Sequence, residues 1–253
     1  MIRLPGFRKA APKEKPEKKK KVRALAAPAR PAGHAASIGA EQYELSPGIL
    51  SLTSPGSRAA LAMAEAGAVL MDRHVERGRR GLAVCAPSAG AGATFTTVNL
   101  AATLAQAGVS TIVIDCNLRR PGLERFIRPG VDSPGVQQFL RGEADRVEEI
   151  IHPEVLPNLS LVYAGGAAPD AQELLASPRL RVMLGECMRN FHCTLVDTPP
   201  ANQCSDALMV AATLGYAVIV ARRDAAYVTD VELLREQLTV NGATVVGSVL
   251  NQA

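Results

Sequence analysis

The sequence has little that would support a disulfide-rich, zinc-binding or secreted protein. It contains no tryptophan, and aromatic residues make up only 4% of its 253 residues. The five cysteines are odd in number and include no C-x-x-C pair, so we expect neither a disulfide framework nor a zinc site. His192 precedes Cys193 within an apolar run, and this context indicates a buried strand instead of a metal site.

Long apolar runs are also missing. No segment approaches the roughly 18–20 apolar residues that a membrane-spanning helix needs, and the first residues lack the apolar region of a secretory signal. An apolar content of 47% and a mean hydropathy of +0.08 nevertheless fit a folded core. These features predict a cytoplasmic protein.

The basic charge is concentrated at the N-terminus. Residues 1–30 carry eleven Lys or Arg and two Glu, so the remaining residues are net acidic although the whole chain is +4. Residues 1–40 are rich in Lys, Pro and Ala, with few large apolar residues to bury, and we expect them to be disordered. This segment is either a solvated linker or an attachment to the anionic inner-membrane surface through residues 1–30. Nucleic-acid binding is not expected, because the segment lacks interleaved aromatic residues.

Helical patterns alternate with short apolar runs in residues 57–253, after a linker at 41–56. A helix is expected over 57–80, where apolar residues recur at helical spacing. The expected strands are 82–86, 111–115, 159–163, 194–197, 217–221 and 244–250. The expected helices between them are 94–106, 178–190, 206–213 and 228–239. The strand segments are near-continuous Val, Ile and Leu runs, which is typical of strands covered on both faces. This order predicts an α/β domain with a doubly wound, mostly parallel sheet flanked by helices.

The most informative segment is residues 85–108, CAPSAGAGATFTTVNLAATLAQAG, in which a strand leads through small residues into a helix. In a P-loop, glycines allow backbone N–H groups to face phosphate oxygens at a helix N-terminus. Gly90 and Gly92 suit that geometry, and Thr94 takes the position of the hydroxyl that binds Mg²⁺. The lysine of the G-x-x-x-x-G-K-[ST] pattern is replaced by Ala93.

Two other interpretations of this loop are open. A dinucleotide-binding G-x-G-x-x-G would place the bulky Phe95 where close packing of helix and strand requires a small residue. The loop could also be an ordinary strand-to-helix turn without a ligand. Asp115 and Asp197 argue against that second interpretation, because both end buried strands at the sheet edge where ligands bind in open α/β sheets. Beside a phosphate they would hold Mg²⁺ directly or through water.

The order of these motifs resembles the cytoplasmic domain of bacterial tyrosine kinases (BY-kinases), the capsular and exopolysaccharide chain-length regulators among the P-loop ATPases. The resemblance covers about residues 57–253. The family's P-G-E-G-K-[ST] loop corresponds to A-G-A-G-A-T, followed by N-L-A at 99–101. The D-x-D-x-R element and the R-P after it correspond to Asp115, Asn117, Arg119, Arg120 and Pro121, and D-T-P-P corresponds to 197–200. Weaker family-like stretches lie at 134–144, 156–166, 172–180 and 245–251. Asn251 resembles a position that contacts adenine in related ATPases.

The sequence also departs from the family pattern, and each departure points toward reduced kinase activity. Ala93 removes the phosphate-binding lysine, and Asn117 removes a carboxylate from the metal region. The E-x-x-R-x-x-R oligomerisation motif is not met after Glu65, and the chain shows no terminal tyrosine cluster. A hydrogen bond to a charged group contributes about 1.5–3 kcal/mol, so the missing lysine would weaken nucleotide binding by about 10- to 150-fold. Phosphoryl transfer should suffer more, since it depends on positioned charge.

The resemblance therefore implies a kinase-like but catalytically impaired accessory protein of exopolysaccharide biosynthesis, for capsule, slime or a holdfast-type adhesin. Its implied partner is the cytoplasmic part of an inner-membrane polysaccharide co-polymerase, and its implied location is cytoplasmic, peripheral to that membrane. Its ligands, if retained, would be ATP or ADP with Mg²⁺. The implied nucleotide-binding residues are Gly90, Gly92, Thr94, Asn117, Arg119 and Asn251, and the implied metal-site residues are Thr94, Asp115 and Asp197.

Two alternatives are open. One is a residual ATPase or tyrosine autokinase, in which Arg119 or Arg120 replaces the lysine. The other is a positioning ATPase-like protein of the partition or cell-division type. The sequence leaves open the polysaccharide, the docking surface and whether the chain forms a homo-oligomer.

Overall fold

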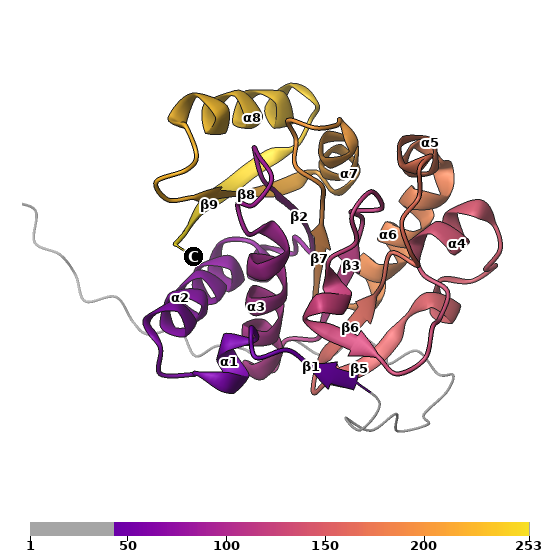
Figure 1. The fold of residues 1–253 in the computed structure, drawn as a ribbon, viewed down its shortest axis with the longest axis horizontal. Helices are drawn as coiled ribbons and strands as arrows, with labels where there is room; N and C mark the ends of the chain where they lie inside the picture. The colour runs from indigo at the N-terminus through magenta and orange to yellow at the C-terminus, as the bar shows by residue number, and fades with distance from the viewer. Residues whose placement is uncertain (1–42, 253) are drawn as a thin grey trace, which may run out of the picture.

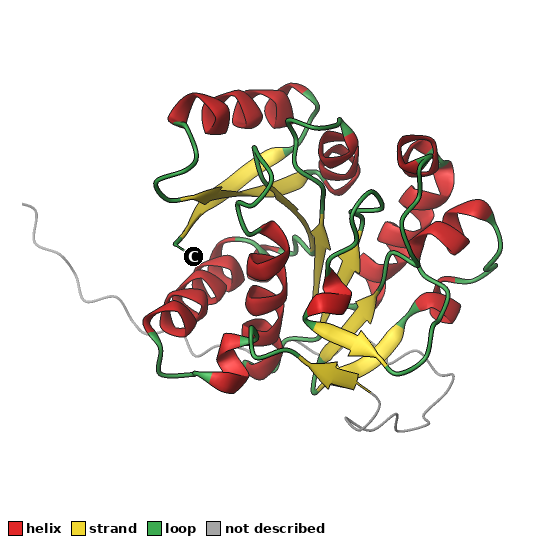
Figure 2. Cartoon of the chain, in the orientation of Figure 1, coloured by secondary structure: helices red, strands yellow, loops and turns green. Residues whose placement is uncertain are grey.

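A seven-stranded sheet lies between two layers of helices in the computed structural model, which describes residues 43–252 (Figures 1 and 2). The sheet order is β5-β6-β3-β7-β2-β8-β9, and only the β5–β6 pair is antiparallel. This architecture confirms the predicted doubly wound, mostly parallel α/β fold. The basic segment predicted to be disordered, residues 1–40, lies outside the described residues, as do 41 and 42.

The strands of this sheet are β2 (Gly81–Cys85), β3 (Thr111–Asp115), β5 (His152–Leu156), β6 (Leu159–Val162), β7 (Cys193–Asp197), β8 (Tyr216–Arg222) and β9 (Thr244–Asn251). The helices are α1 (Leu50–Thr53), α2 (Arg58–Arg73), α3 (Ala93–Gln106), α4 (Val136–Arg141), α5 (Ala171–Ala176), α6 (Pro178–Asn190), α7 (Asp206–Leu214) and α8 (Val228–Val240). A separate antiparallel pair joins β1 (Tyr43–Leu45) to β4 (Ile127–Pro129).

The sheet separates two hydrophobic cores, because successive residues of each central strand point to opposite faces. In β3, Ile112 and Ile114 pack with helices α4 to α8, whereas Val113 packs with α2 and α3. In β2, Ala83 belongs to the core beside helices α4 to α8, and Leu82 belongs to the core beside α2 and α3. The five residues of β2, of β3 and of β7 are all buried. Burial on both faces explains why these strands are continuous apolar runs.

The prediction of coverage on both faces is wrong for β9. Only Asn251 of this strand is buried, and Leu250 keeps 66% of its surface exposed. β9 lies at the edge of the sheet and pairs only with β8. The Val and Leu content of a strand therefore does not reveal whether helices cover both of its faces, since an edge strand can carry the same composition.

The predicted helix over 57–80 begins where expected and ends early. Ser57 is the N-cap, and its hydroxyl accepts the N–H of Ala60 at 3.2 Å. The helix ends at Arg73, and a 3₁₀ turn over Val75–Arg77 ends at Gly78, which has a left-handed φ of 79°. The short elements α1, α4, α5 and β5 are not predicted from the sequence. They are four to six residues long, too short to show a clear period.

The described part of the predicted linker, residues 43–56, packs against the domain. Ile49 is fully buried, and β1 pairs with β4 in the register Leu45↔Ile127. The side chain of Asn99 on α3 accepts the N–H of Leu50 at 2.8 Å and donates to the carbonyl of Gly48 at 3.0 Å. A single asparagine of the N-L-A segment thus attaches the incoming chain to α3.

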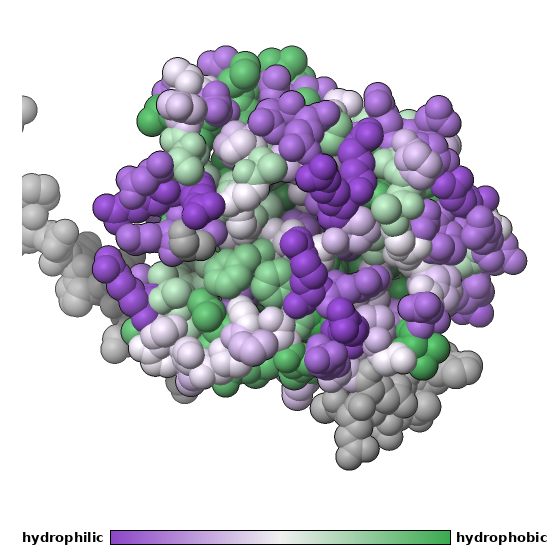
Figure 3. Space-filling model, in the orientation of Figure 1, coloured by the Kyte–Doolittle hydropathy of each residue, from purple (hydrophilic) through white to green (hydrophobic). Residues whose placement is uncertain are grey.

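Hydrophilic side chains predominate on the face seen in Figure 3, which also shows small apolar patches. Between residues 43 and 252, none of the helices is both long enough and apolar enough to cross a membrane.

Candidate functional site

The loop between β2 and α3 has the geometry of an anion-binding P-loop. Gly90 and Gly92 have left-handed φ angles of 77° and 88°, which side-chain-bearing residues rarely adopt. Within residues 43–252 the N–H groups of Gly92, Ala93 and Thr94 donate to no protein acceptor. These groups lie at the N-terminus of a 14-residue helix, where the helix dipole also favours an anion.

Asn251 at the end of β9 holds this loop from the far side. Its amide nitrogen donates to the carbonyl of Ala91 at 3.1 Å, and the residue is only 7% exposed. A Cβ at Gly92 would overlap that amide, so glycine is required there for space as well as for its φ angle. In this structure the Asn251 amide binds the loop, and its contact with adenine stays a prediction.

The structure brings the two predicted carboxylates together with the P-loop threonine. Asp115 and Asp197 end neighbouring strands and are directly paired in register. Both are buried, at 1% and 0% exposure. The Thr94 hydroxyl donates to Asp197 Oδ2 at 2.6 Å, and the Thr97 hydroxyl donates to Asp197 Oδ1 at 3.4 Å. Sequence reasoning missed Thr97, although it is the third threonine of A-T-F-T-T.

Backbone groups of the loop after β3 surround Asp115. Its Oδ2 accepts the N–H of Gly122 at 2.8 Å and of Leu123 at 3.1 Å, and its Oδ1 accepts the N–H of Asn117 at 3.0 Å. The side chain of Asn117 in turn accepts the backbone N–H of Arg120 at 3.1 Å. Asn117 therefore stabilises the turn through its own side chain.

The two carboxylates perturb each other. Burial, followed by the nearby Asp115 carboxylate, raises the pKa of Asp197, and the hydroxyls of Thr94 and Thr97 oppose this shift. Burial also raises the pKa of Asp115, against its three backbone N–H donors. A pair of buried carboxylates is more stable when it shares a proton or binds a cation.

Arg119 forms an ion pair with Asp206, and this pairing engages the guanidinium that could have replaced the missing lysine. Its Nε donates to Asp206 Oδ2 at 2.8 Å and its Nη2 to Asp206 Oδ1 at 3.2 Å. The Asp206 side chain is fully buried at the start of α7, whereas the Arg119 side chain is 36% exposed. Because this bidentate pair fixes the guanidinium, the contact of Arg119 with nucleotide stays a prediction. Sequence reasoning missed Asp206, which lies 87 residues away.

The residues present fit a Mg²⁺–nucleotide ligand. The N–H groups of the loop suit phosphate oxygens, and the Thr94 hydroxyl and the carboxylates of Asp115 and Asp197 are the hard oxygen donors that Mg²⁺ prefers. In the part of the chain described here, no group of three or more His, Cys, Asp or Glu could hold a metal alone, so phosphate oxygens would complete its shell. Ala93 supplies no charge, and its methyl group packs against the core on the α3 side of the sheet.

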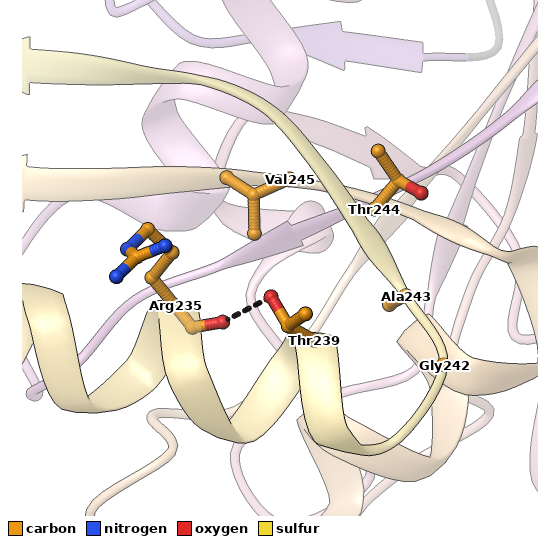
Figure 4. A pocket seen from close by; sticks show the side chains of 6 residues that line it. All are labelled: Arg235, Thr239, Gly242, Ala243, Thr244 and Val245. Carbon is orange, nitrogen blue, oxygen red and sulfur yellow. Dashed lines mark hydrogen bonds between the residues drawn. The ribbon is translucent and has the colours of Figure 1, made fainter.

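A separate hollow of about 340 Å³ lies between the end of α8 and the start of β9, lined by Arg235, Thr239, Gly242, Ala243, Thr244 and Val245 (Figure 4). The Thr239 hydroxyl there donates to the carbonyl of Arg235 at 2.8 Å. Strands β2, β8 and β9 run parallel. The hollow lies where β9 begins and the P-loop follows the end of β2, so the two are at opposite ends of the strands. It contributes no residue to the site.

Comparison with known proteins supports the resemblance. No family model matches the chain. A tyrosine-protein kinase of Salmonella typhi, Wzc, is 29% identical over 164 residues, which are 65% of this chain and 22% of that protein. The tyrosine-protein kinase CpsD of Streptococcus pneumoniae is 27% identical over 171 residues, 68% of this chain and 75% of that protein. The solved kinase domain of the Escherichia coli tyrosine kinase ETK superposes with a TM-score of 0.76 at 26% identity, covering 81% of this chain and 80% of that domain.

These findings confirm the similarity to bacterial tyrosine kinases that the motifs predict, and with it the P-loop NTPase fold. The chain spans about a fifth of the length of relatives such as Wzc, with 22% of that protein matched.

Replacing Asp197 by Asn should stabilise the chain at neutral pH in the absence of ligand. A carboxyl whose pKa is raised by folding contributes stability below its ordinary range, and this contribution is lost as the pH rises through the raised pKa. Asp197→Asn removes the titrating carboxyl and with it this loss of stability. Each pKa unit by which folding raises the pKa corresponds to about 1.4 kcal/mol of the loss. Thermal melting from about pH 5 upward should show a flatter profile for the variant, whereas the exposed control Asp132→Asn should follow the wild type.

Replacing Arg119 by Ala should destabilise the fold, because a buried carboxylate loses both donors. Hydrogen bonds to charged groups contribute about 1.5–3 kcal/mol, and the lower end is expected because Arg119 is partly exposed. The neighbouring Arg120→Ala should change the free energy of unfolding by less than about 0.5 kcal/mol. Urea denaturation of both variants, and of Arg119→Ala in an Asp206→Asn background, measures how much the Arg119–Asp206 pair contributes to the free energy of unfolding. Equal effects of the two single substitutions would contradict this assignment.

Proposed function

We propose that this chain is a kinase-like protein that still binds Mg²⁺–nucleotide but transfers phosphate poorly, and that it acts in exopolysaccharide assembly by docking on a membrane partner. The observation that carries the proposal is the combination of an intact backbone cradle with Ala93 at the lysine position. The similarity to tyrosine kinases gives this combination its functional context.

Retained binding is supported by the donors that remain. The backbone N–H groups at the start of α3 do not depend on the missing side chain. Thr94 and Asp197 are already in contact at 2.6 Å, so the metal-binding hydroxyl and a carboxylate are oriented together. Losing one charge-assisted hydrogen bond weakens such a site and leaves the backbone donors in place.

Impaired transfer is supported by the charges that are absent or engaged elsewhere. Transfer of a phosphoryl group depends on cations placed around the transferred oxygens. Ala93 offers none, Arg119 is paired with Asp206, and Asn117 replaces a carboxylate and stabilises a turn. These changes lie on the groups that would act in the transition state.

The proposed partner is the cytoplasmic part of an inner-membrane polysaccharide co-polymerase, for capsule, slime or a holdfast-type adhesin. The resemblance to the family of chain-length regulators supports this partner. The basic residues 1–30 support a position beside the anionic membrane surface, at about 1 kcal/mol per basic residue. In this proposal the protein influences the assembly of the co-polymerase without phosphorylating it.

Calorimetric titration with ATP and Mg²⁺, followed by mass spectrometry for phosphotyrosine, tests the proposal. We expect measurable binding and no phosphotyrosine, including at Tyr227, whose side chain is 74% exposed. Phosphotyrosine formed by the chain alone would instead support the tyrosine autokinase, which the names of the relatives favour over a partition-type ATPase.

Restoring the lysine provides a gain-of-function test. Ala93→Lys should tighten binding of Mg²⁺–ATP by about 10- to 150-fold, because it adds one charge-assisted contact to phosphate. Ala107→Lys, at the exposed far end of α3, adds the same charge without reaching the loop and serves as the control. Equal affinities of the two variants would contradict a phosphate-binding loop at Gly90 to Thr94.

In cells, Thr94→Ala should leave polysaccharide output largely unchanged, since docking does not require phosphoryl transfer. A deletion of the gene sets the baseline, and an Asp197→Ala strain provides an independent site variant. Output from both variants should stay close to that of the wild type and well above the deletion baseline. A collapse of output to the deletion level in both strains, with normal protein abundance, would show that the site itself is required.

A further inference from the structure

The P-loop of the candidate site carries no basic side chain beside its two carboxylates. Asp115 and Asp197 are buried side by side, the P-loop has no lysine, and Arg119 is engaged by Asp206. A phosphate chain would add further negative charge. A phosphate-binding cation from outside the P-loop would strengthen the binding of such a ligand.

The 3₁₀ turn η3 (Leu123–Arg125) carries such a cation to the site. The N–H of Arg125 donates to the carbonyl of Gly122 at 3.3 Å. Residues i and i+3 lie above one another in a 3₁₀ turn, so the side chain of Arg125 returns over Gly122. Its Nη2 atom lies 2.9 Å from the position that a Cβ on Gly122 would occupy.

Thr94 reaches the same point from the P-loop. Its Oγ1 and Cγ2 atoms both lie 3.0 Å from that position of a Cβ on Gly122. Gly122 has an ordinary φ of −130°, so its conformation does not require glycine. A Cβ there would lie close to both side chains, so the flexible Arg125 side chain would have to move aside. The N–H of Gly122 also donates to Asp115, which fixes this meeting point beside the carboxylate pair.

The guanidinium of Arg125 is available for a ligand. Within residues 43–252 no carboxylate forms an ion pair with it, whereas Arg128 nearby lies 3.8 Å from Glu44. Arg125 is exposed and also borders a hollow of about 230 Å³. A guanidinium can bind phosphate oxygens with two parallel hydrogen bonds, which an ammonium group cannot do.

We propose that Arg125 supplies the phosphate-binding cation that Ala93 lacks, by contacting the terminal phosphate oxygens of a nucleoside triphosphate seated on the P-loop beside Thr94. This assignment rests on the proposed retention of nucleotide binding. It differs from the replacement of the lysine by Arg119 or Arg120, and it concerns binding only.

Titration of the full chain and of three variants with Mg²⁺–ATP tests the assignment. Arg125→Ala should weaken binding by about 10- to 150-fold, as expected for one charge-assisted contact. Arg125→Lys should recover part of this loss, because it keeps the charge without the planar fork. Arg128→Ala removes the same charge from an exposed side chain and should change affinity by less than about twofold, well under the tenfold that 1.4 kcal/mol would give. Melting temperatures of all variants establish that they are folded.

A fourth variant tests the geometry without removing the charge. Gly122→Ala places a methyl group between Arg125 and Thr94, and it should weaken Mg²⁺–ATP binding in the same direction. AMP binding, which involves no terminal phosphates, should be equal in the wild type and Arg125→Ala. Unchanged Mg²⁺–ATP affinity in Arg125→Ala overturns the assignment alone. Absence of any binding to the wild type overturns the proposed nucleotide binding together with it.

Discussion

The arrangement of the loops at the carboxyl ends of the strands depends on two buried carboxylates, which occupy paired positions in neighbouring strands. Burying a charge is costly unless donors surround it. Asp115 therefore draws in three backbone N–H groups of the following loop, and Asp197 draws in the hydroxyls of Thr94 and Thr97. The loop after β3 and the first turn of α3 are fixed by these contacts. The same contacts that satisfy the carboxylates also bring together the groups that we propose to bind phosphate and metal.

Glycines mark the places where chain segments approach most closely around this centre. At Gly92 the P-loop contacts the amide of Asn251 from the last strand, and at Gly122 the guanidinium of Arg125 and the side chain of Thr94 both lie near the position of a Cβ. A side chain at Gly92 would push apart two segments that are distant in the sequence. Packing of this kind makes the loop conformation a property of the tertiary structure, and it reduces the number of conformations the loop can adopt without ligand.

In the proposed function, Ala93 at the lysine position separates two tasks that a P-loop usually performs together. Backbone N–H groups bind a phosphate chain wherever it is seated, whereas transfer needs cations at defined oxygens. Ala93 leaves the first group intact and removes a member of the second. The similarity to tyrosine kinases at 26–29% identity is compatible with both outcomes. The charges of individual residues therefore decide function within a shared fold.

The sequence by itself determined the central sheet, the long helices and the position of the candidate site. Buried parallel strands are continuous apolar runs, and the motif spacing placed Gly90, Thr94, Asp115 and Asp197 at one edge, where the structure has them. It did not determine the exposure of β9, the short elements or the ion pair of Arg119, whose partner is 87 residues away. Local patterns carry no record of which distant segment packs on them. Only the tertiary structure decided that Arg119 is paired with Asp206 and that the guanidinium of Arg125 lies near Thr94, because both outcomes depend on long-range packing.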